Sequence, residues 1–465
     1  MAERGRWAFG VWGNLGYSYP VTVGDIMKSA ILSVACALLA LTACPASVFA
    51  AESAARPDIA GLTQRAGAGD VRAMNDLGKA YYNGEGVERD YDLAFKWLDK
   101  AAATGDAQAQ ADLGDLYVTG SGVPEDADMA MKLYRQSAAQ NNAEGRYSVG
   151  WMYETGKGVA KDETEAARWY KLAADQDFIF AINHLADLYY GGRGMARDYA
   201  EALRLYRKSA DLGSGYGYDA LGDMFDDGEG VTQDPAKALD YYKKAADLGN
   251  CGGLYAMGRI YEKGRNGQAQ DLGQARQWYQ KAADRTCEYG QLAIGRFYDE
   301  GIGMETDAGE AFKYYALAAM QGNSIGQLKL GSSYFYGDFL PRDYGQAFKW
   351  YQMAADQAYA PGQYKIGYMY AKGYGVKADY AQALNWLKLS AAQGDDGGEY
   401  QLGVMYENAL GVPQDRKTAL MWYLLSAAQD NEDARKAAES VKTRMSGSDV
   451  RAAQAMAADF KPVRN

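Results

Sequence analysis

A unit of 36 residues recurs ten times along most of this chain, and this periodicity constrains the fold more than any other feature. Each copy carries an apolar residue followed by Gly or Ala, and the spacing changes only through one inserted residue between Gly258 and Gly295. An aromatic side chain stands three residues after each small residue, from Tyr81 in the first copy to Tyr406 in the last. A fixed period of about 20 to 50 residues is typical of solenoids and other repeat arrays.

Each copy contains two apolar segments at helical spacing, joined by a glycine-rich loop such as Gly156-Lys157-Gly158-Val159. The loop glycines permit positive φ, so the first helix can end and the chain can reverse. An acid recurs before every second segment, from Asp90 to Asp415, where it can accept hydrogen bonds from free N–H groups of the helix start. Such a helix–turn–helix unit cannot bury its apolar face alone and must stack on its neighbours.

These residues resemble the Sel1-like repeat family, a longer-loop relative of tetratricopeptide repeats. The pattern A-x(6)-L-G-x-x-Y-x-x-G-x-G-V-x-x-D-x(3)-A-x-x-W-Y-x-x-A-A is nearly complete in residues 143–178. The resemblance implies an all-α fold, a right-handed superhelical α/α solenoid of about ten 36-residue repeats over residues 71–431. Residues 51–70 are then an N-terminal half repeat, and residues 432–465 form C-terminal capping helices.

Residues 1–50 are expected to be a targeting region. The mostly apolar stretch 30–42 is shorter than the roughly 20 residues that a membrane-spanning helix needs. It fits a signal peptide over about residues 27–50, with cleavage after Ala50, and we expect the natural start at Met27 rather than Met1.

A second interpretation of the same stretch is a bacterial lipoprotein signal, because Leu41-Thr42-Ala43-Cys44 resembles a lipoprotein box. Cys44 would then be lipidated and anchor the protein to the outer membrane, and a third interpretation is a buried helix of the fold. No later apolar run is long enough to span a membrane. The sequence therefore predicts an exported protein of the periplasm or cell envelope without a transmembrane span in its mature chain.

Composition excludes several classes of function. The 60 Asp and Glu outnumber the 49 Lys and Arg and give a net charge of −11, which argues against nucleic-acid binding. The single histidine, His184, excludes zinc sites that need two, and we expect it on the surface because the same slot is polar in other repeats. Phosphate-loop and serine-nucleophile motifs are missing. The sequence thus predicts no enzyme, no cofactor and no metal.

Two cysteines, Cys251 and Cys287, stand at the start of the first helix in neighbouring repeats 6 and 7. Cysteines of an exported protein are expected to pair. Stacked helices, however, lie about 8–10 Å apart, whereas a disulfide needs Cα atoms about 4.4–6.8 Å apart. The sequence leaves this disulfide open.

Recurring second-helix tyrosines such as Tyr134 and Tyr170 are expected in the core. Functional residues should instead lie at positions where the residue type differs from one repeat to the next. We call the Gly or Ala that follows the apolar residue in each repeat the landmark residue. The tetratricopeptide resemblance implies that first helices line a concave groove, through positions three before and one and four after this landmark residue. These positions share one helical face. The candidate partner-binding residues there are Tyr147, Trp151, Asp187, Tyr190, Asp219, Asp223, Phe335, Tyr364, Tyr368 and Tyr400.

The same face also holds Glu154, Tyr255 and Glu262, and the competing interpretation is that several of its tyrosines contact the next repeat. Exposed aromatics in a groove can be binding hot spots. We expect a non-enzymatic scaffold or adaptor of the bacterial envelope that presents this groove to a partner protein or peptide. The alternative is an assembly factor that binds polysaccharide or peptidoglycan, and a hydrolase is a third possibility.

Overall fold

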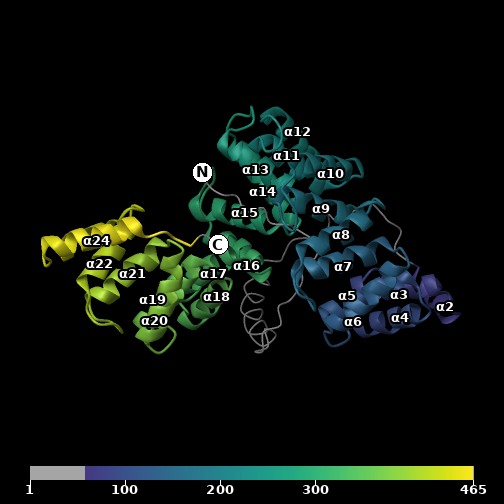
Figure 1. Ribbon diagram of the computed structural model, residues 1–465, viewed down its shortest axis with the longest axis horizontal. Helices are drawn as coiled ribbons and strands as arrows, with labels where there is room; N and C mark the ends of the chain where they lie inside the picture. The colour runs from purple at the N-terminus through teal and green to yellow at the C-terminus, as the bar shows by residue number, and fades with distance from the viewer. Residues whose placement is uncertain (1–57, 464–465) are drawn as a thin grey trace. The chain divides into compact units, whose positions relative to one another are not determined.

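The computed structural model describes residues 58–463, and every regular element in that range is an α-helix (Figure 1). The predicted signal peptide, with cleavage after Ala50 or lipidation of Cys44, lies outside the described residues. The chain divides into two compact units, Met1–Asp234 and Pro235–Asn465. Within the described range no helix is both long and apolar enough to cross a membrane.

The first unit begins with one short helix, α2 (Ile59–Gly67), and continues with helix pairs. Its first helices of the repeats are α3 (Val71–Asn83), α5 (Ala107–Thr119), α7 (Ala143–Thr155), α9 (Ile179–Gly191) and α11 (Gly215–Asp227). Its second helices are α4 (Tyr91–Ala103), α6 (Ala127–Ala139), α8 (Glu163–Ala174) and α10 (Tyr199–Asp211).

The second unit begins with the second helix of repeat 5 and ends with two additional helices, α23 (Glu432–Lys442) and α24 (Gly447–Asp459). Its first helices are α13 (Cys251–Lys263), α15 (Glu288–Glu300), α17 (Ser324–Tyr336), α19 (Ala360–Lys372) and α21 (Asp396–Glu407). Its second helices are α12 (Pro235–Asp247), α14 (Leu272–Asp284), α16 (Ala308–Met320), α18 (Tyr344–Asp356), α20 (Tyr380–Ala392) and α22 (Arg416–Ala427).

The recurring acids cap the second helices, as their position predicts. In repeat 3, for example, the Asp162 carboxylate accepts a hydrogen bond of 3.0 Å from the backbone N–H of Glu165. The same contact starts α4, α6, α10, α14, α16, α18, α20 and α22. The preceding first helix α7 ends at Gly156, whose φ of 74° lies in the left-handed region that favours glycine. These two local signals set the boundaries of both helices.

In most repeats a second-helix tyrosine lies over the landmark glycine and forms the core, whereas Leu98 and Leu387 take its place in repeats 1 and 9. A Cβ added to Gly150 would lie only 2.8 Å from the ring of Tyr170, so the two helices can approach this closely only because the residue is Gly. The tyrosines at this register are between 0% and 4% exposed, which confirms that they are core residues: Tyr134, Tyr170, Tyr206, Tyr242, Tyr279, Tyr315, Tyr351 and Tyr423.

Within each unit the first helices form the inner side of the stack. Several successive first helices pack against one another, as α5 does on α7 and α19 on α21. Second helices of successive repeats do not contact one another to that extent in the described chain. Side chains on the free face of the first helices therefore line the inner surface of each unit.

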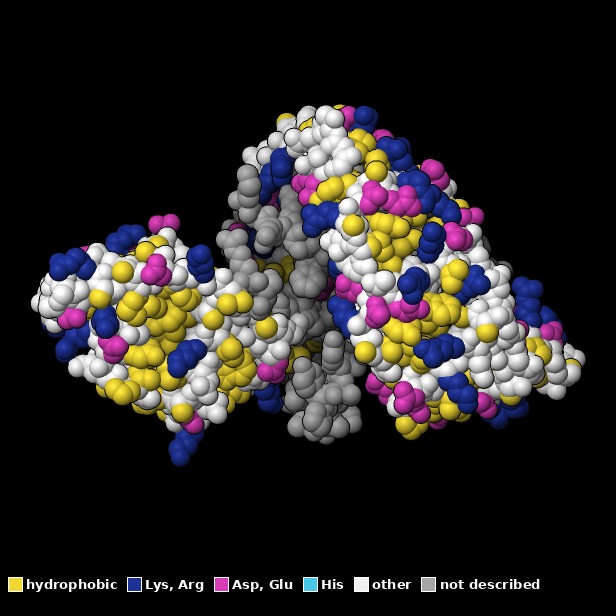
Figure 2. Space-filling view, viewed as in Figure 1, with side chains coloured by type: hydrophobic (Ala, Val, Ile, Leu, Met, Phe, Trp, Pro, Cys, Tyr) yellow, Lys and Arg dark blue, Asp and Glu magenta, His cyan; other side chains and the backbone are white. Residues whose placement is uncertain are grey.

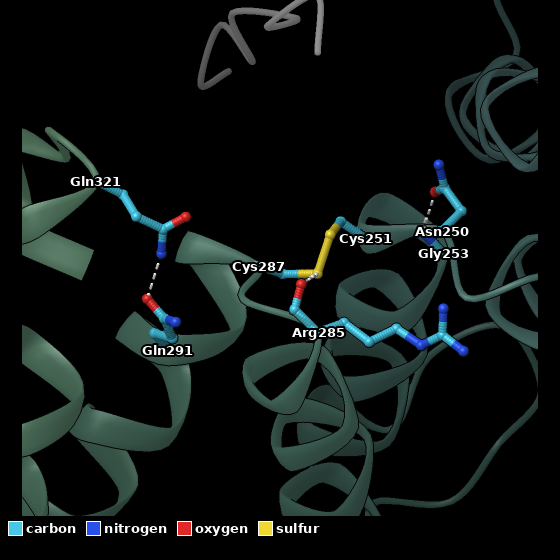
Figure 3. Close-up of a disulfide and its surroundings, with 7 residues drawn as sticks. All are labelled: Asn250, Cys251, Gly253, Arg285, Cys287, Gln291 and Gln321. Carbon is cyan, nitrogen blue, oxygen red and sulfur yellow. Dashed lines mark hydrogen bonds between the residues drawn. A yellow bond between two sulfur atoms is a disulfide. The ribbon is translucent and has the colours of Figure 1, made fainter. Parts of the chain in front are cut away.

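A disulfide joins Cys251 and Cys287, the pair that the sequence left open (Figure 3). Cys251 opens α13 and Cys287 is the N-cap of α15, so both lie at helix starts. Their Cα atoms are 5.6 Å apart, closer than the usual separation of packed helix axes. The bond ties repeat 6 covalently to repeat 7.

Candidate partner-binding surface

Acidic side chains on the inner surface pair with the buried tyrosines. Tyr134 donates its hydroxyl hydrogen to Asp115 over 2.7 Å, and Tyr170 donates to Glu154 over 2.6 Å. The same pairing from a second helix to the first helix of its own repeat occurs in Tyr206–Asp187, Tyr279–Glu262, Tyr315–Asp299 and Tyr423–Glu407. These acids occupy the positions one and four after the landmark residue, so part of the predicted groove chemistry serves to satisfy buried hydroxyls.

Glu154 lies at the centre of a network that includes the next repeat. Nδ1 of His184 lies 3.0 Å from Glu154 Oε2, Arg193 forms an ion pair with Oε1 at 3.1 Å, and the Tyr147 hydroxyl lies 3.2 Å from Nε2 of His184. Burial alone would raise the Glu154 pKa, but hydrogen bonding and the charge of His184, with Tyr170 and Arg193, lower it to about 2. We call Glu154, Tyr147, Tyr170, His184 and Arg193 the Glu154 network.

The expectation that His184 is a surface residue is wrong. Its side chain is 13% exposed and packs against the rings of Tyr147 and Tyr170. The slot is polar in other repeats, but here Glu154 of the preceding repeat lies within hydrogen-bonding distance and stabilises an imidazole inside the stack. The signal that sequence reasoning missed was the spacing of 30 residues between this acid and the histidine. The spacing recurs in the ion pair of Asp299 with Lys329.

Three other acids come together one repeat earlier. Asp112 and Asp115 of α5 and Glu144 of α7 each offer a carboxylate oxygen, and these oxygens all lie within 4.8 Å of one another. Lys79 of α3 reaches Asp112 at 3.5 Å. We call Asp112, Asp115 and Glu144 the acid cluster, and among the described residues it is the one group found with the spacing of metal ligands.

Two of the predicted residues of the first unit, Tyr147 and Trp151, lie close to the Glu154 network and the acid cluster. Tyr147 is buried and packs on Phe178, the N-cap of α9, and on Phe180 of the next repeat, which supports the competing interpretation for this tyrosine. Tyr147 and Trp151 also line a small pocket of about 30 Å³ together with Asp115.

The remaining predicted positions of this unit lie further along it. Asp187 accepts hydrogen bonds from Tyr206 and from Tyr216 of the next repeat. Tyr190 packs against Tyr199, with ring centroids 5.2 Å apart. Asp219 and Asp223 lie half-buried on α11.

In the second unit three predicted residues meet. Phe335 packs against Tyr368 with ring centroids 6.4 Å apart, and Tyr364 against Tyr368 at 6.2 Å. Tyr400 lies apart from them and packs on Tyr423. Three further rings complete what we call the aromatic cluster, whose members are Phe335, Tyr336, Tyr344, Tyr364, Tyr368 and Tyr374.

Sequence reasoning missed half of the aromatic cluster. Tyr344 begins a second helix, and Tyr374 lies in the loop after α19, where its ring stacks on Tyr344 at 4.8 Å. Tyr336 is the last residue of α17 and is 52% exposed. The available signal was Tyr374, because other repeats place no aromatic between the two loop glycines.

Lysines border the aromatic cluster. Nζ of Lys365 lies 5.1 Å from the Tyr364 ring centroid and 5.9 Å from that of Tyr336, and Lys372 lies 5.9 Å from that of Tyr368. Figure 2 shows hydrophobic side chains gathered over the last repeats of the second unit, whereas on the first unit acidic and basic side chains interrupt them.

Comparison with known proteins identifies the repeats. The Sel1 repeat family matches the chain at residues 71–106, 107–142, 143–178, 179–214, 216–250, 252–287, 289–323, 324–359, 360–395 and 398–431. A solved structure, c5321, described as a protective antigen present in uropathogenic Escherichia coli strains displaying an SLR fold, is 32% identical. It aligns over 86% of this chain and 85% of its own with a TM-score of 0.55.

A Sel1 repeat protein from Oxalobacter formigenes is also 32% identical, over 49% of this chain and 100% of its own, with a TM-score of 0.44. No significant match was found among curated proteins. Proteins built from Sel1 and related tetratricopeptide-like repeats are generally scaffolds for protein interaction and typically non-enzymatic. The ten matched repeats and the helix pairs confirm the predicted all-α solenoid, and the chain belongs to the Sel1 repeat family.

Proposed function

We propose that this protein is a non-enzymatic scaffold of the bacterial envelope that binds an extended segment of a partner protein through the aromatic cluster. The observation that carries the proposal is the gathering of six aromatic rings from α17, α18, α19 and the loop after α19. One of these rings, Tyr336, is more than half exposed although it is large and partly apolar. Tyrosine clusters on a rigid surface are typical centres of protein recognition because they bury much area at little entropic cost.

The charges beside the aromatic cluster indicate the chemistry of the partner. Lys365 and Lys372 place positive charge beside the rings, although the whole chain carries a net charge of −11, and the charge of Lys365 also acts on Asp395. A partner segment with acidic residues next to aromatic or aliphatic ones would bury its apolar groups on the rings and pair its carboxylates with these lysines. Charge complementarity of this kind steers association and fixes register.

The envelope location rests on two supports. The sequence carries an apolar segment with a cleavage pattern before Ala51, and Cys251 forms a disulfide with Cys287. Disulfides persist mainly in oxidising compartments such as the bacterial periplasm. Intact-mass measurement of the protein from its native host tests this point, since cleavage after Ala50 and lipidation of Cys44 give different masses.

A photocrosslinking amino acid tests the binding surface. Placed at Tyr336, it should capture a discrete partner in living cells, and Tyr368→Ala in the same chain should strongly reduce that product. The matched control places the crosslinker at Leu389 of α20, which is 51% exposed against 52% for Tyr336. The proposal fails if both positions capture the same proteins, or if Tyr368→Ala leaves the Tyr336 product unchanged while circular dichroism shows intact helices.

Polysaccharide is the second candidate partner, because the stacked pair Tyr344–Tyr374 presents rings of the kind that pack on sugar faces. Co-sedimentation with purified peptidoglycan separates the two candidates. Binding that Tyr374→Ala abolishes, without any captured protein at Tyr336, favours the glycan.

A further inference from the structure

The acid cluster is built by three consecutive first helices on the inner surface of the first unit. Asp112 and Asp115 come from α5, Glu144 from the first turn of α7, and Asn75 and Lys79 from α3. Asp112 is only 6% exposed, and the other two acids are half-buried. Three carboxylates therefore meet around one buried group, Asp112, where their repulsion is screened less than on an open surface.

Two buried oxygens at this place lack any donor. Oδ2 of Asp112 and Oδ1 of Asn75 make no hydrogen bond, and the Asn75 side chain is 7% exposed. The Asn75 amide lies within hydrogen-bonding range of the Asp112 carboxylate, so its orphan oxygen belongs to a side chain that borders the acid cluster. Buried acceptors without a donor are rare in folded proteins and indicate a missing water or ion.

The protein supplies little positive charge to the acid cluster. Lys79 lies 3.5 Å from Asp112, but its side chain is 46% exposed. Gln108 donates its neutral amide to Asp112 over 3.2 Å and to Glu144 over 2.5 Å. One half-exposed lysine against three acids leaves an excess of negative charge.

We propose that the acid cluster is a calcium site, with Asp112, Asp115 and Glu144 as ligands and Asn75 as an additional oxygen donor. Calcium takes oxygen ligands about 2.3–2.6 Å away, and carboxylate oxygens within 4.8 Å of one another can share such an ion. The small pocket beside Asp115 has room for a ligand water. Bound calcium displaces the ammonium of Lys79 and the amide of Gln108.

Terbium luminescence tests the site directly, because Tb³⁺ substitutes for calcium and is sensitised by nearby aromatic rings. Tyr134 donates to Asp115, and Tyr147 and Trp151 line the adjoining pocket. We expect a Tb³⁺ signal on the full chain that Ca²⁺ displaces. Asp112→Asn should weaken binding by at least about tenfold, since even outer-shell substitutions at metal sites cost this much.

Two further variants separate a calcium site from a general acidic surface. Lys79→Gln removes the competing ammonium and should tighten Tb³⁺ binding, whereas a structural ion pair would give no such gain. Asp299→Asn is the matched control, because Asp299 also accepts from a buried tyrosine, Tyr315, but carries Lys329 instead of further acids. It should leave the signal unchanged.

Several results would overturn the proposal. These are the absence of a Tb³⁺ signal that Ca²⁺ displaces, a signal that survives Asp112→Asn, or equal losses in Asp112→Asn and Asp299→Asn. Circular dichroism of each variant shows whether its helices are intact. The site lies on different repeats from the aromatic cluster, so either proposal can fail without the other.

Discussion

The acid cluster and the Glu154 network are two versions of one arrangement, placed one repeat apart. In both, an acid on a first helix accepts a hydrogen bond from the buried tyrosine of its own repeat. The next repeat then supplies different charges, since His184 and Arg193 face Glu154 whereas Glu144 faces Asp115. The buried tyrosine keeps one register and takes its acid from position one or four after the landmark residue, and the neighbouring repeat decides whether the charge of that acid is balanced.

The difference is visible in the two pKa values. The Glu154 pKa falls to about 2 despite burial, because its partners stabilise the carboxylate. The Asp112 pKa rises to about 6, because burial and Glu144 outweigh Lys79. Ionised Glu154 therefore stabilises the fold, whereas ionised Asp112 destabilises it.

The largest expected effect follows from removing the acid of the balanced site. Glu154→Ala leaves His184 and the Tyr170 hydroxyl without their acceptor and Arg193 with only Glu163 at 3.6 Å, and should destabilise the surrounding repeats by about 3 kcal/mol. Because repeat arrays often unfold in parts, hydrogen exchange over α7–α9 is the suitable measurement. Glu165→Gln is the control: it breaks an exposed pair with Arg168 and should cost less than about 1 kcal/mol. Equal protection in the two variants would contradict the prediction.

The opposite sign is expected at the unbalanced site. In the absence of divalent ions, Asp112→Asn removes a buried, poorly compensated charge and should stabilise the first unit at pH 7 by about 2 kcal/mol. Thermal unfolding of wild type and variant in EDTA measures this. Excess calcium should reduce or reverse the difference, because only the wild type keeps the full ligand set. Destabilisation in EDTA would show that Asp112 is already balanced.

The two sites should also respond to pH in opposite directions. Glu154, with a folded pKa of about 2 against an ordinary value of 4.5, contributes stability above pH 4.5 that is lost as the pH falls towards 2. Asp112, with a pKa raised from 3.8 to about 6, destabilises the fold above pH 6, and this effect disappears as the pH falls towards 3.8.

Because the two contributions oppose each other, the free energy of unfolding should change less with pH in the wild type than in either variant. Denaturant titrations between pH 2 and pH 8 measure this. The wild type should become more stable as the pH falls from 6 to 3.8, and Asp112→Asn should lack this increase. Glu154→Gln should instead show a smaller decrease in stability than the wild type as the pH falls below 4.5. Parallel curves for the two variants would disprove the contrast.

The smallest effect tests the outer edge of the Glu154 network. Tyr147→Phe removes the hydroxyl that lies against His184 but keeps the ring contacts with Phe178 and Phe180. The loss should be about 1 kcal/mol, the usual value of one hydrogen bond. Tyr147→Ala should cost clearly more in the same unfolding experiment, because the ring itself packs on the next repeat. Equal losses would mean that the hydroxyl carries the whole contribution.

Features that recur in every repeat were predictable from the sequence. Asp162 was predicted as a cap, Gly156 as a helix stop and Tyr170 as a core residue, because the same residue types return at the same register. The physical cause is local, since capping and close helix contact depend on a few neighbouring positions.

Contacts between repeats were not predictable in the same way. His184 and Glu154 occupy different registers, and only the placement of repeat 4 beside repeat 3 brings them together. Asp112 and Glu144 meet for the same reason. In the aromatic cluster, Phe335, Tyr364 and Tyr368 were predictable because they lie at positions that share one helical face. Tyr374 was not, because a loop side chain follows no helical period.

The bond between Cys251 and Cys287 has a consequence for how the second unit comes apart. In a linear array each repeat is held by its neighbours alone, so unfolding advances from a free end one interface at a time. An advancing front that opens α15 from the C-terminal side still leaves its first residues clasped to α13, with Cα atoms 5.6 Å apart. The two repeats remain tethered and can pack again, so unfolding is slowed at this point. Reduction of the disulfide removes this effect and leaves an interface like those between the other repeats.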